Sequence, residues 1–188
     1  MQEHAKSLTV VNGIDTAHVM EVVNQIIDDP SKAMTNWSVS TEWKGGTRSD
    51  THVKGYVVGG EFVKKDFTLS VDEPLELGGT NLFANPQEYL LSALNACMIV
   101  GYAAACAMHG IELDELRIET EGDIDLRGFL GIDPDVAPGY EELKYTVHIR
   151  GNATPEEFQK VHEIVCATSP NRFNISRPIK LNTNLVVE

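Results

Sequence analysis

Basic residues are scarce in this chain of 188 residues, which has 15 Lys and Arg against 28 Asp and Glu. The formal net charge of −13 disfavours binding to nucleic acid or to an anionic membrane, because both rely on clustered basic side chains. The chain also lacks Gly- and Ser-rich linkers, repeats and low-complexity tracts. We therefore expect one main globular domain, with a terminal extension at most.

Cysteine is scarce as well. The three cysteines, Cys97, Cys106 and Cys166, are an odd number without the spacing of a disulfide framework. The first six residues are polar and no apolar segment follows them, so no signal peptide is predicted. Both observations fit a reducing compartment, and we expect a cytoplasmic protein.

Signals for a cofactor are missing too. No Gly-rich loop stands between a predicted strand and a predicted helix, which argues against a nucleotide. Cys106 and His109 have the spacing of one ligand pair, but no second pair accompanies them. We expect neither a cofactor nor a metal ion.

Apolar residues form one long run, from Leu90 to Met108, without a charged residue. A run of about 18 such residues is compatible with a membrane span. It is rich in Ala, however, contains Ser92, Asn95 and Gly101, and has no Lys or Arg cluster on either flank. We prefer a buried central helix of a protein that does not enter the membrane.

Hydrophobic periodicity and turn residues predict an α+β fold with mainly antiparallel sheet, since no βαβ repeat is present. Gly59-Gly60 is typical of a hairpin turn. Helices are predicted over residues 15–29, 86–109 and 154 to about 169, and strands over 37–43, 52–58, 61–71, 116–126, 143–149 and 179–187.

The central helix has a strong start signal. Asn85 suits the N-cap, Pro86 the first helical position, and Glu88 can complete a capping box. Gly110 is typical of the residue just past a helix end. This helix is apolar nearly all round, so a second helix or another subunit must cover what one sheet leaves exposed.

Cys97 lies three turns into that helix, where a thiol is either inert core or a nucleophile in a dry, rigid site. A reactive thiol there needs a neighbouring cation, because the middle of a helix gives little help from the dipole. Cys106 is nine residues further on, on the opposite side of the helix, and is interpreted as core.

A longer pattern surrounds Cys97. The stretch from Asn85 to Cys97 reads Asn-Pro-x-Glu-x-Leu-Leu-x-Ala-Leu-x-x-Cys, and Gly110-Ile111 follows. Residues 121–131 and 138–140 resemble an insertion common in one subgroup. Together these motifs resemble the OsmC/Ohr family, the osmotically inducible protein C and organic hydroperoxide resistance group, from about Trp37 to Val187.

The resemblance implies an intertwined homodimer with the OsmC-like fold, in which antiparallel sheets surround long central helices. It also implies two identical sites at the subunit interface and thiol-dependent reduction of organic hydroperoxides, as a defence against oxidative stress. Residues 1–35 would then form an N-terminal helical extension, and residues 36–188 the OsmC-like domain.

Carried over residue by residue, the resemblance makes Cys97 the thiol that attacks peroxide. Glu88 stands where the hydroperoxide-reducing branch of the family has a carboxylate that pairs with an Arg beside this thiol. Arg48 resembles that Arg, since it follows a Gly-Gly turn, although the spacing differs by one residue. Without the resemblance, Glu88 is a capping residue and Arg48 a solvated turn residue.

Ser169-Pro170-Asn171 stands where many members have Cys-Pro-Val, and serine cannot form a disulfide. Cys166, one helical turn earlier, is a candidate resolving thiol or else a core residue. An external thiol reductant is the alternative. Two functions therefore stay open: a peroxidase that uses Cys97, or a non-catalytic relative that binds a small apolar or thiol-reactive ligand at the dimer interface.

Overall fold

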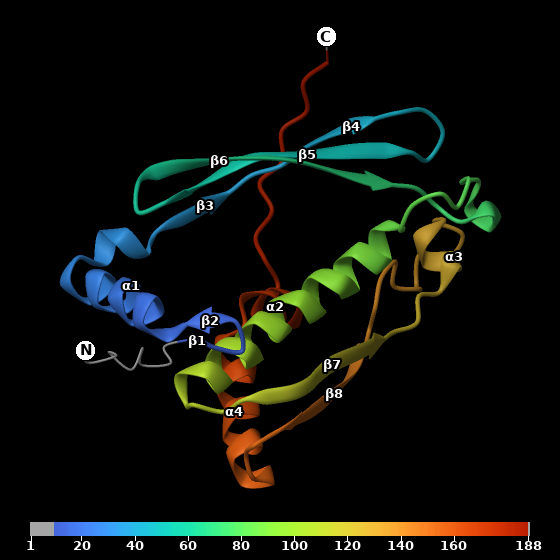
Figure 1. The fold of residues 1–188 in the computed structure, drawn as a ribbon. Helices are drawn as coiled ribbons and strands as arrows, with labels where there is room; N and C mark the ends of the chain where they lie inside the picture. The colour runs from blue at the N-terminus through green and yellow to red at the C-terminus, as the bar shows by residue number, and fades with distance from the viewer. Residues whose placement is uncertain (1–9, 188) are drawn as a thin grey trace, which may run out of the picture. The chain divides into compact units, whose positions relative to one another are not determined.

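The computed structural model describes residues 10–187 (Figure 1). The chain divides into two compact units: the first comprises the residues up to 10 and residues 15–90, and the second comprises residues 11–14 and 91–188. Part of the predicted 1–35 extension, residues 1–9, lies outside the described residues. The boundary of that extension stays a prediction.

The predicted N-terminal helix is present in the first unit as α1 (Thr16–Asp28). Its N-cap is Asp15, whose carboxylate accepts hydrogen bonds from the backbone N–H groups of Ala17 and His18 at 3.0 and 3.2 Å. The two-stranded sheet of β1 (Val10–Val11) and β2 (Ile14–Asp15) precedes it, and the 3₁₀ helix η1 (Pro30–Ala33) follows it.

The main sheet of the first unit has four antiparallel strands (Figure 1). Its central strand β5 pairs with β6 through a turn in which Gly59 and Gly60 have φ values of +56° and +86°, as a two-residue hairpin requires. The predicted strand 37–43 is divided, because its two halves pair with different ends of β5. The strands are β3 (Thr35–Trp37), β4 (Ser40–Trp43), β5 (Ser49–Val58) and β6 (Glu61–Val71).

This sheet has no apolar core of its own. Among the described residues, every buried hydrophobic side chain belongs to the second unit. An antiparallel sheet normally buries one face and leaves the other to solvent. Here large apolar side chains are exposed along β3, β4 and β6, namely those of Trp37, Trp43, Phe62, Phe67 and Leu69.

The central helix α2 (Pro86–Met108) has the predicted bounds to within one residue. Gly110, which has a φ of +70°, lies just past its end. The N–H of Ile111 donates to the carbonyl of Cys106 at 2.8 Å, and that of Gly110 to the carbonyl of Ala107 at 3.1 Å. This arrangement is a glycine-based helix cap, which satisfies the last free carbonyls of the helix.

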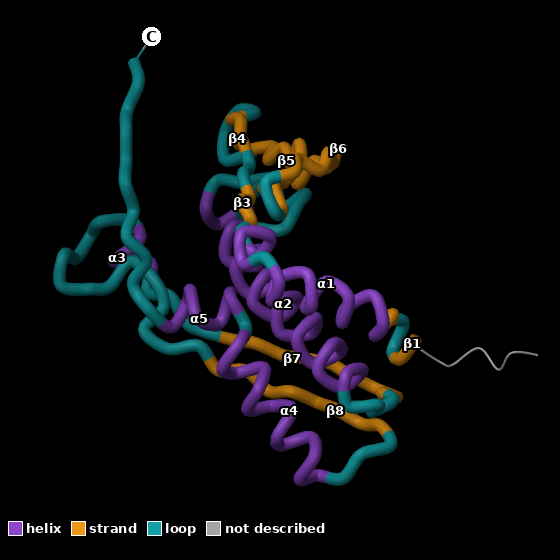
Figure 2. The backbone as a smooth tube through the Cα atoms, turned by 90° about the vertical axis from the view of Figure 1, so that its left-hand side faces the viewer, coloured by secondary structure: helices purple, strands orange, loops and turns teal. Residues whose placement is uncertain are grey.

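The core of the second unit lies between α2, the antiparallel pair of β7 (Leu113–Glu121) and β8 (Lys144–Gly151), and α4 (Pro155–Thr168) (Figure 2). Gly101 of α2 permits close approach to α4, since a Cβ at this position would lie 3.2 Å from a methyl group of Val165. The predicted capping box of Thr154 and Glu157 opens α4. The core residues are Leu94, Met98, Tyr102, Cys106, Ile111, Ile118, Val161 and Val165.

Core contacts cover α2 on one side only. Its buried residues are Leu94, Met98, Tyr102, Cys106 and Ala107, whereas Val100 is 67% exposed. Among the described residues α2 is also the one helix whose length and composition would suit a membrane span, a property that core helices of soluble proteins share. This exposed apolar side of α2 agrees with the sequence analysis, which predicts that a second helix or another subunit covers part of the helix.

Two short helices complete the second unit: α3 (Leu126–Phe129), inside the 121–131 motif, and α5 (Pro170–Ser176). The prediction of a last strand over residues 179–187 is wrong for this chain, because residues 178–187 form no regular element. A strand exists only where an edge pairs with it. Leu181 and Leu185 are 81% and 85% exposed. The α+β class and the antiparallel sheets are confirmed, while the dimer stays a prediction.

Candidate thiol site

Cys97 is half-buried on α2, and its sulfur lies 3.4 Å from the hydroxyl oxygen of Ser169. Ser169 is only 5% exposed. It ends α4 and is the N-cap of α5, where its hydroxyl accepts a hydrogen bond from the N–H of Arg172 at 3.4 Å. Position 169, which the sequence resemblance predicts to be a cysteine in many relatives, is therefore in contact with Cys97.

Side-chain amides on both sides of this contact hold the backbone in place. The amide of Asn171 donates to the carbonyl of Ala93 at 2.8 Å, which ties α5 to α2. Asn95 accepts a hydrogen bond from the hydroxyl of Thr120 at 2.5 Å and donates to the carbonyl of Ile118 at 3.3 Å. These bonds fix α2 against β7 within two residues of Cys97.

Cys166 has a different and more polar surrounding. Its sulfur lies 3.5 Å from Nε2 of His162 and 3.6 Å from the hydroxyl of Tyr145. Arg172 donates from Nε to the Tyr145 oxygen at 3.2 Å and from Nη1 to the carbonyl of Cys166 at 2.8 Å. The hydroxyl of Tyr102 contacts Nδ1 of His162. Groups from α2, β8, α4 and α5 thus meet at this thiol.

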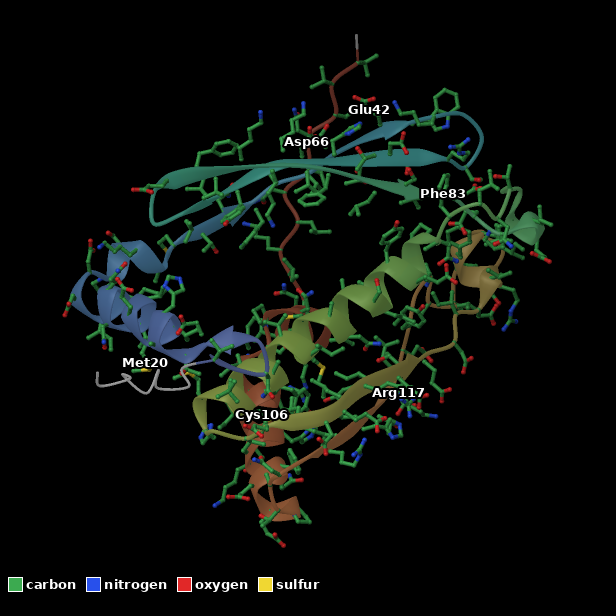
Figure 3. The ribbon with its side chains drawn as sticks, viewed as in Figure 1. Met20, Glu42, Asp66, Phe83, Cys106 and Arg117 are labelled. Atoms are coloured by element: carbon green, nitrogen blue, oxygen red, sulfur yellow. The ribbon has the colours of Figure 1, made fainter. Side chains whose placement is uncertain are left out.

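Burial raises the pKa of both phenols in this cluster, Tyr102 and Tyr145. Both therefore remain protonated at neutral pH. The hydrogen bond to Tyr145 raises the pKa of Arg172, which keeps its charge. Cys106, labelled on α2 in Figure 3, is fully buried in the core as predicted, and burial raises the pKa of its thiol.

Arg48, in the first unit, follows the Gly45–Gly46 turn between β4 and β5. Its N–H donates to the carbonyl of Gly45 at 3.1 Å. The guanidinium lies over the ring of Phe83, labelled in Figure 3, at 5.2 Å from the centroid. Its Nε is buried without a hydrogen-bond partner among the described residues. A solvated turn residue would not be held in this way.

Asp72 explains how the loop beside Arg48 is held. Its carboxylate is fully buried and accepts hydrogen bonds from the Thr47 hydroxyl at 2.8 Å, from both the hydroxyl and the N–H of Thr80, and from the N–H groups of Glu73 and Leu82. These hydrogen bonds, that of the Thr80 side chain first, hold the pKa of Asp72 well below its ordinary value. Asp72 therefore joins the turn before Arg48 to the loop before α2.

Glu88 forms the predicted capping box. Its carboxylate accepts from the N–H of Asn85 at 2.8 Å, and its own N–H donates to the Asn85 side chain at 2.8 Å. The hydroxyl of Tyr89 donates to the carbonyl of Ser70 at 2.9 Å, which anchors the first turn of α2. Within the described residues no ion pair joins Glu88 to Arg48. Their pairing stays a prediction.

The structure thus brings together Cys97 with Ser169, and Cys166 with a polar cluster, while Arg48 and Glu88 lie in the other unit. Sequence reasoning missed the roles of His162, Tyr145 and Arg172. One signal was available, since His162 and Cys166 are four residues apart on one helix face. Residues 10–187 contain no group of three or more His, Cys, Asp or Glu side chains placed to hold a metal ion.

Comparisons with known proteins agree with this fold. A family model described as OsmC-like protein matches residues 79–184. The uncharacterized protein YmaD of Bacillus subtilis (strain 168) is 27% identical over 124 residues, which are 63% of this chain and 75% of that protein.

Two solved structures are similar in fold. An OsmC like protein from Mycoplasma pneumoniae has a TM-score of 0.59 and 15% identity, covering 75% of this chain and 87% of the other. A putative osmotic stress induced and detoxification response protein from Psychrobacter arcticus has a TM-score of 0.55 and 12% identity, covering 72% and 85%.

Proposed function

This chain belongs to the OsmC-like protein family, and from that premise we propose that it is a cysteine-based peroxidase that reduces organic hydroperoxides through Cys97. The sulfur of Cys97 attacks one oxygen of the O–O bond. An S–O bond forms as the O–O bond breaks, and the leaving oxygen takes up a proton to become an alcohol. Cys97 is oxidised to a sulfenic acid while the hydroperoxide is reduced.

The observation that carries this proposal is the 3.4 Å contact between Cys97 and Ser169. In this contact the attacking thiol of Cys97 lies beside position 169, where a cysteine side chain would resolve the sulfenic acid. Serine has no thiol with which to do so, and an external thiol reductant then completes the cycle by forming and reducing a mixed disulfide. Cys166, one turn before Ser169, is the candidate internal alternative.

Arg48 is the proposed cation for the Cys97 thiolate. Its guanidinium is permanently charged, and its unpartnered buried Nε needs an acceptor. In this proposal Glu88 orients the guanidinium through its second carboxylate oxygen, because the first is engaged with the N–H of Asn85. Reaction takes place in the cytoplasm, where thiols remain reduced.

Ser169 also favours a second candidate function. A buried serine against Cys97 cannot protect a sulfenic acid from further oxidation. A relative that only binds a small apolar or thiol-reactive ligand at a dimer interface would need no such protection. The rate of peroxide reaction at Cys97 separates the two functions.

That rate is the first prediction. With one equivalent of cumene hydroperoxide, Cys97 of the reduced protein is expected to form a sulfenic acid much faster than free cysteine does, as seen by intact mass with a sulfenic-acid trap. Cys97→Ser abolishes the product. Arg48→Gln slows it by about tenfold or more because the thiolate loses its cation.

Cys106→Ser is the matched control, since that buried thiol is expected to take no part. If Cys97 reacts with cumene hydroperoxide no faster than free cysteine, the peroxidase proposal is wrong and ligand binding remains.

We further propose that the active form is a homodimer in which the second copy covers the apolar surfaces that one chain leaves exposed. The sheet of the first unit has no buried apolar residue, and one side of α2 is uncovered. Exposed apolar side chains in such number are typical of surfaces that another chain covers. The extended segment 178–187, with its alternating apolar residues, also lacks a strand partner within the described chain.

The second prediction concerns this interface. Light scattering on a sizing column is expected to give twice the mass of one chain. Phe67→Asp places a charge on the exposed apolar face of β6 and should convert the dimer to monomer. Lys64→Asp, at a polar exposed position of the same strand, should leave the dimer intact. A monomeric wild type, or a Phe67→Asp variant that stays dimeric, contradicts the proposal.

A further inference from the structure

We infer that the second unit contains another reactive thiol, Cys166, which uses His162 as its base to add to small apolar molecules that carry a conjugated carbonyl. Cys97 takes no part in this reaction. The two sulfurs have different neighbours: Cys97 contacts Ser169, whereas Cys166 contacts an imidazole and a phenol. The inference therefore goes beyond the peroxidase function and does not depend on it.

The hydrogen bonds around His162 suit a base. Nε2 faces the Cys166 sulfur at 3.5 Å, and Nδ1 contacts the hydroxyl of Tyr102. With the ring proton on Nδ1, His162 donates to Tyr102 and offers the Nε2 lone pair to the thiol proton. After proton transfer both ring nitrogens are donors, and each still faces an acceptor. The ring can thus hold a proton without changing its position.

Tyr145 supports the sulfur from the other side. Because Arg172 donates from Nε to the Tyr145 oxygen at 3.2 Å, the phenol O–H is free to donate to the Cys166 sulfur at 3.6 Å. Among residues 10–187, the titratable or charged groups that face Cys166 are His162 of α4, Tyr145 of β8 and Arg172 of α5. Tyr102 of α2 contacts this group through His162.

A cavity of about 560 Å³ lies beside the cluster. Its volume is within the range of small-molecule sites. Apolar side chains from β8 and α4, including Val147, Ile149 and Phe158, make up much of the lining, and the neighbours of the Cys166 sulfur, Tyr145 and His162, line the same cavity. A molecule with an apolar body and one carbonyl oxygen matches this distribution.

The reaction step is a conjugate addition. Nε2 of His162 takes the proton from the Cys166 thiol as the sulfur attacks the β-carbon of an α,β-unsaturated ketone or imide. An S–C bond forms, the C=C π bond is lost, and its electrons move to the carbonyl oxygen. His162 then returns the proton to the α-carbon. Atoms and charge balance, and neither an oxidant nor a reductant is needed.

The test uses the full chain carrying Cys97→Ser, with N-ethylmaleimide as the probe. Aliquots quenched over time are digested, and mass spectrometry measures the labelling of Cys166 and Cys106. Cys166 is expected to react several-fold faster than the thiol of glutathione. His162→Gln slows it by about tenfold or more, as expected for a lost base. Tyr145→Phe slows it several-fold. His148→Gln, on β8 but bonded to Glu119, changes nothing.

Buried Cys106 reports on folding in the same samples, because it stays unlabelled while the core is intact. In a folded His162→Ala variant, added imidazole should restore part of the Cys166 rate, which a purely structural role of the ring would not produce. If Cys106 becomes labelled in His162→Gln, the core of that variant is no longer intact. The Cys166 rate of the Tyr145→Phe variant is then used instead. A Cys166 rate no faster than that of glutathione, or unchanged in the folded variants, overturns the inference.

Failure of this inference is distinguishable from failure of the proposed peroxidase function. The peroxidase is read at Cys97 with cumene hydroperoxide, and the addition is read at Cys166 in a chain without Cys97. If Cys166 reacts quickly with cumene hydroperoxide but not with N-ethylmaleimide, the proposed conjugate addition is also wrong. Such a result would mean that this thiol reacts with peroxides and not with conjugated carbonyl compounds.

Discussion

Ser169→Cys is expected to form a disulfide with Cys97 as soon as Cys97 is oxidised, and to do so almost completely. The Cys97 sulfur already lies 3.4 Å from the Ser169 oxygen. A sulfur at this position would reach further than oxygen does, and a disulfide needs about 2.05 Å between the sulfurs. The sulfenic acid formed by one equivalent of cumene hydroperoxide would therefore be consumed by the introduced thiol.

Two measurements check this result. Intact mass should show the loss of two hydrogens without an added oxygen, and reduction should reverse it. The disulfide would close a loop between positions 72 residues apart, which the chain-entropy account values at about 4 kcal/mol of added stability. The free energy of unfolding should therefore be higher for the oxidised variant than for its reduced form.

Thr168→Cys is the matched control, because this neighbouring side chain is exposed and bonds to its own helix at the carbonyl of Ile164. It is expected to form no disulfide with Cys97. If Ser169→Cys accumulates sulfenic or sulfinic acid at Cys97 instead of a disulfide, the arrangement of these two positions is not the one described here.

Asp72→Ala is expected to lower the free energy of unfolding by about 3 kcal/mol or more, because it leaves several buried hydrogen-bond donors without an acceptor. The side chain is fully buried, and it joins the turn before Arg48 to the loop before α2. Chemical denaturation measures this loss. Asp66→Ala, which removes an exposed carboxylate of β6 (labelled in Figure 3), should change stability by only a few tenths of a kcal/mol.

The loss should depend on pH in a defined direction. The pKa of Asp72 is depressed in the folded protein, so its stabilisation is fully present above the unfolded pKa of about 3.9. It disappears as pH falls through the lower folded pKa. The difference between wild type and Asp72→Ala should thus be constant near neutral pH and shrink only in strong acid. A difference that grows on acidification would rule out the charged, hydrogen-bonded form of Asp72.

Local signals in the sequence were sufficient for much of the fold. Caps and turn residues, such as Asn85 and Gly110 around α2 or Thr154 before α4, predicted helix limits because each satisfies backbone groups by short-range contacts. The division of the strand 37–43 was not predictable, because it depends on which part of β5 pairs with each half. The segment 179–187 alternates like a strand, but alternation cannot supply the edge that a strand requires.

The candidate site, too, was predictable only in part from the sequence. The contact of Cys97 with the 169 position could be anticipated from the resemblance to the OsmC/Ohr family. Asp72 could not, since a single acidic residue in a predicted loop gives no sign that five donors converge on it. The cluster at Cys166 also draws on Tyr145 and Arg172, which lie 21 and 6 residues away, and such long-range contacts leave no local pattern.

The sheet of β3 to β6 without an apolar core has a thermodynamic consequence. If a second copy supplies its cover, then folding of this unit and association of the chains are one equilibrium. Its melting temperature becomes a function of protein concentration, and dilution acts on it as a denaturant. The cell could then regulate the amount of folded protein simply through how much of the chain it makes.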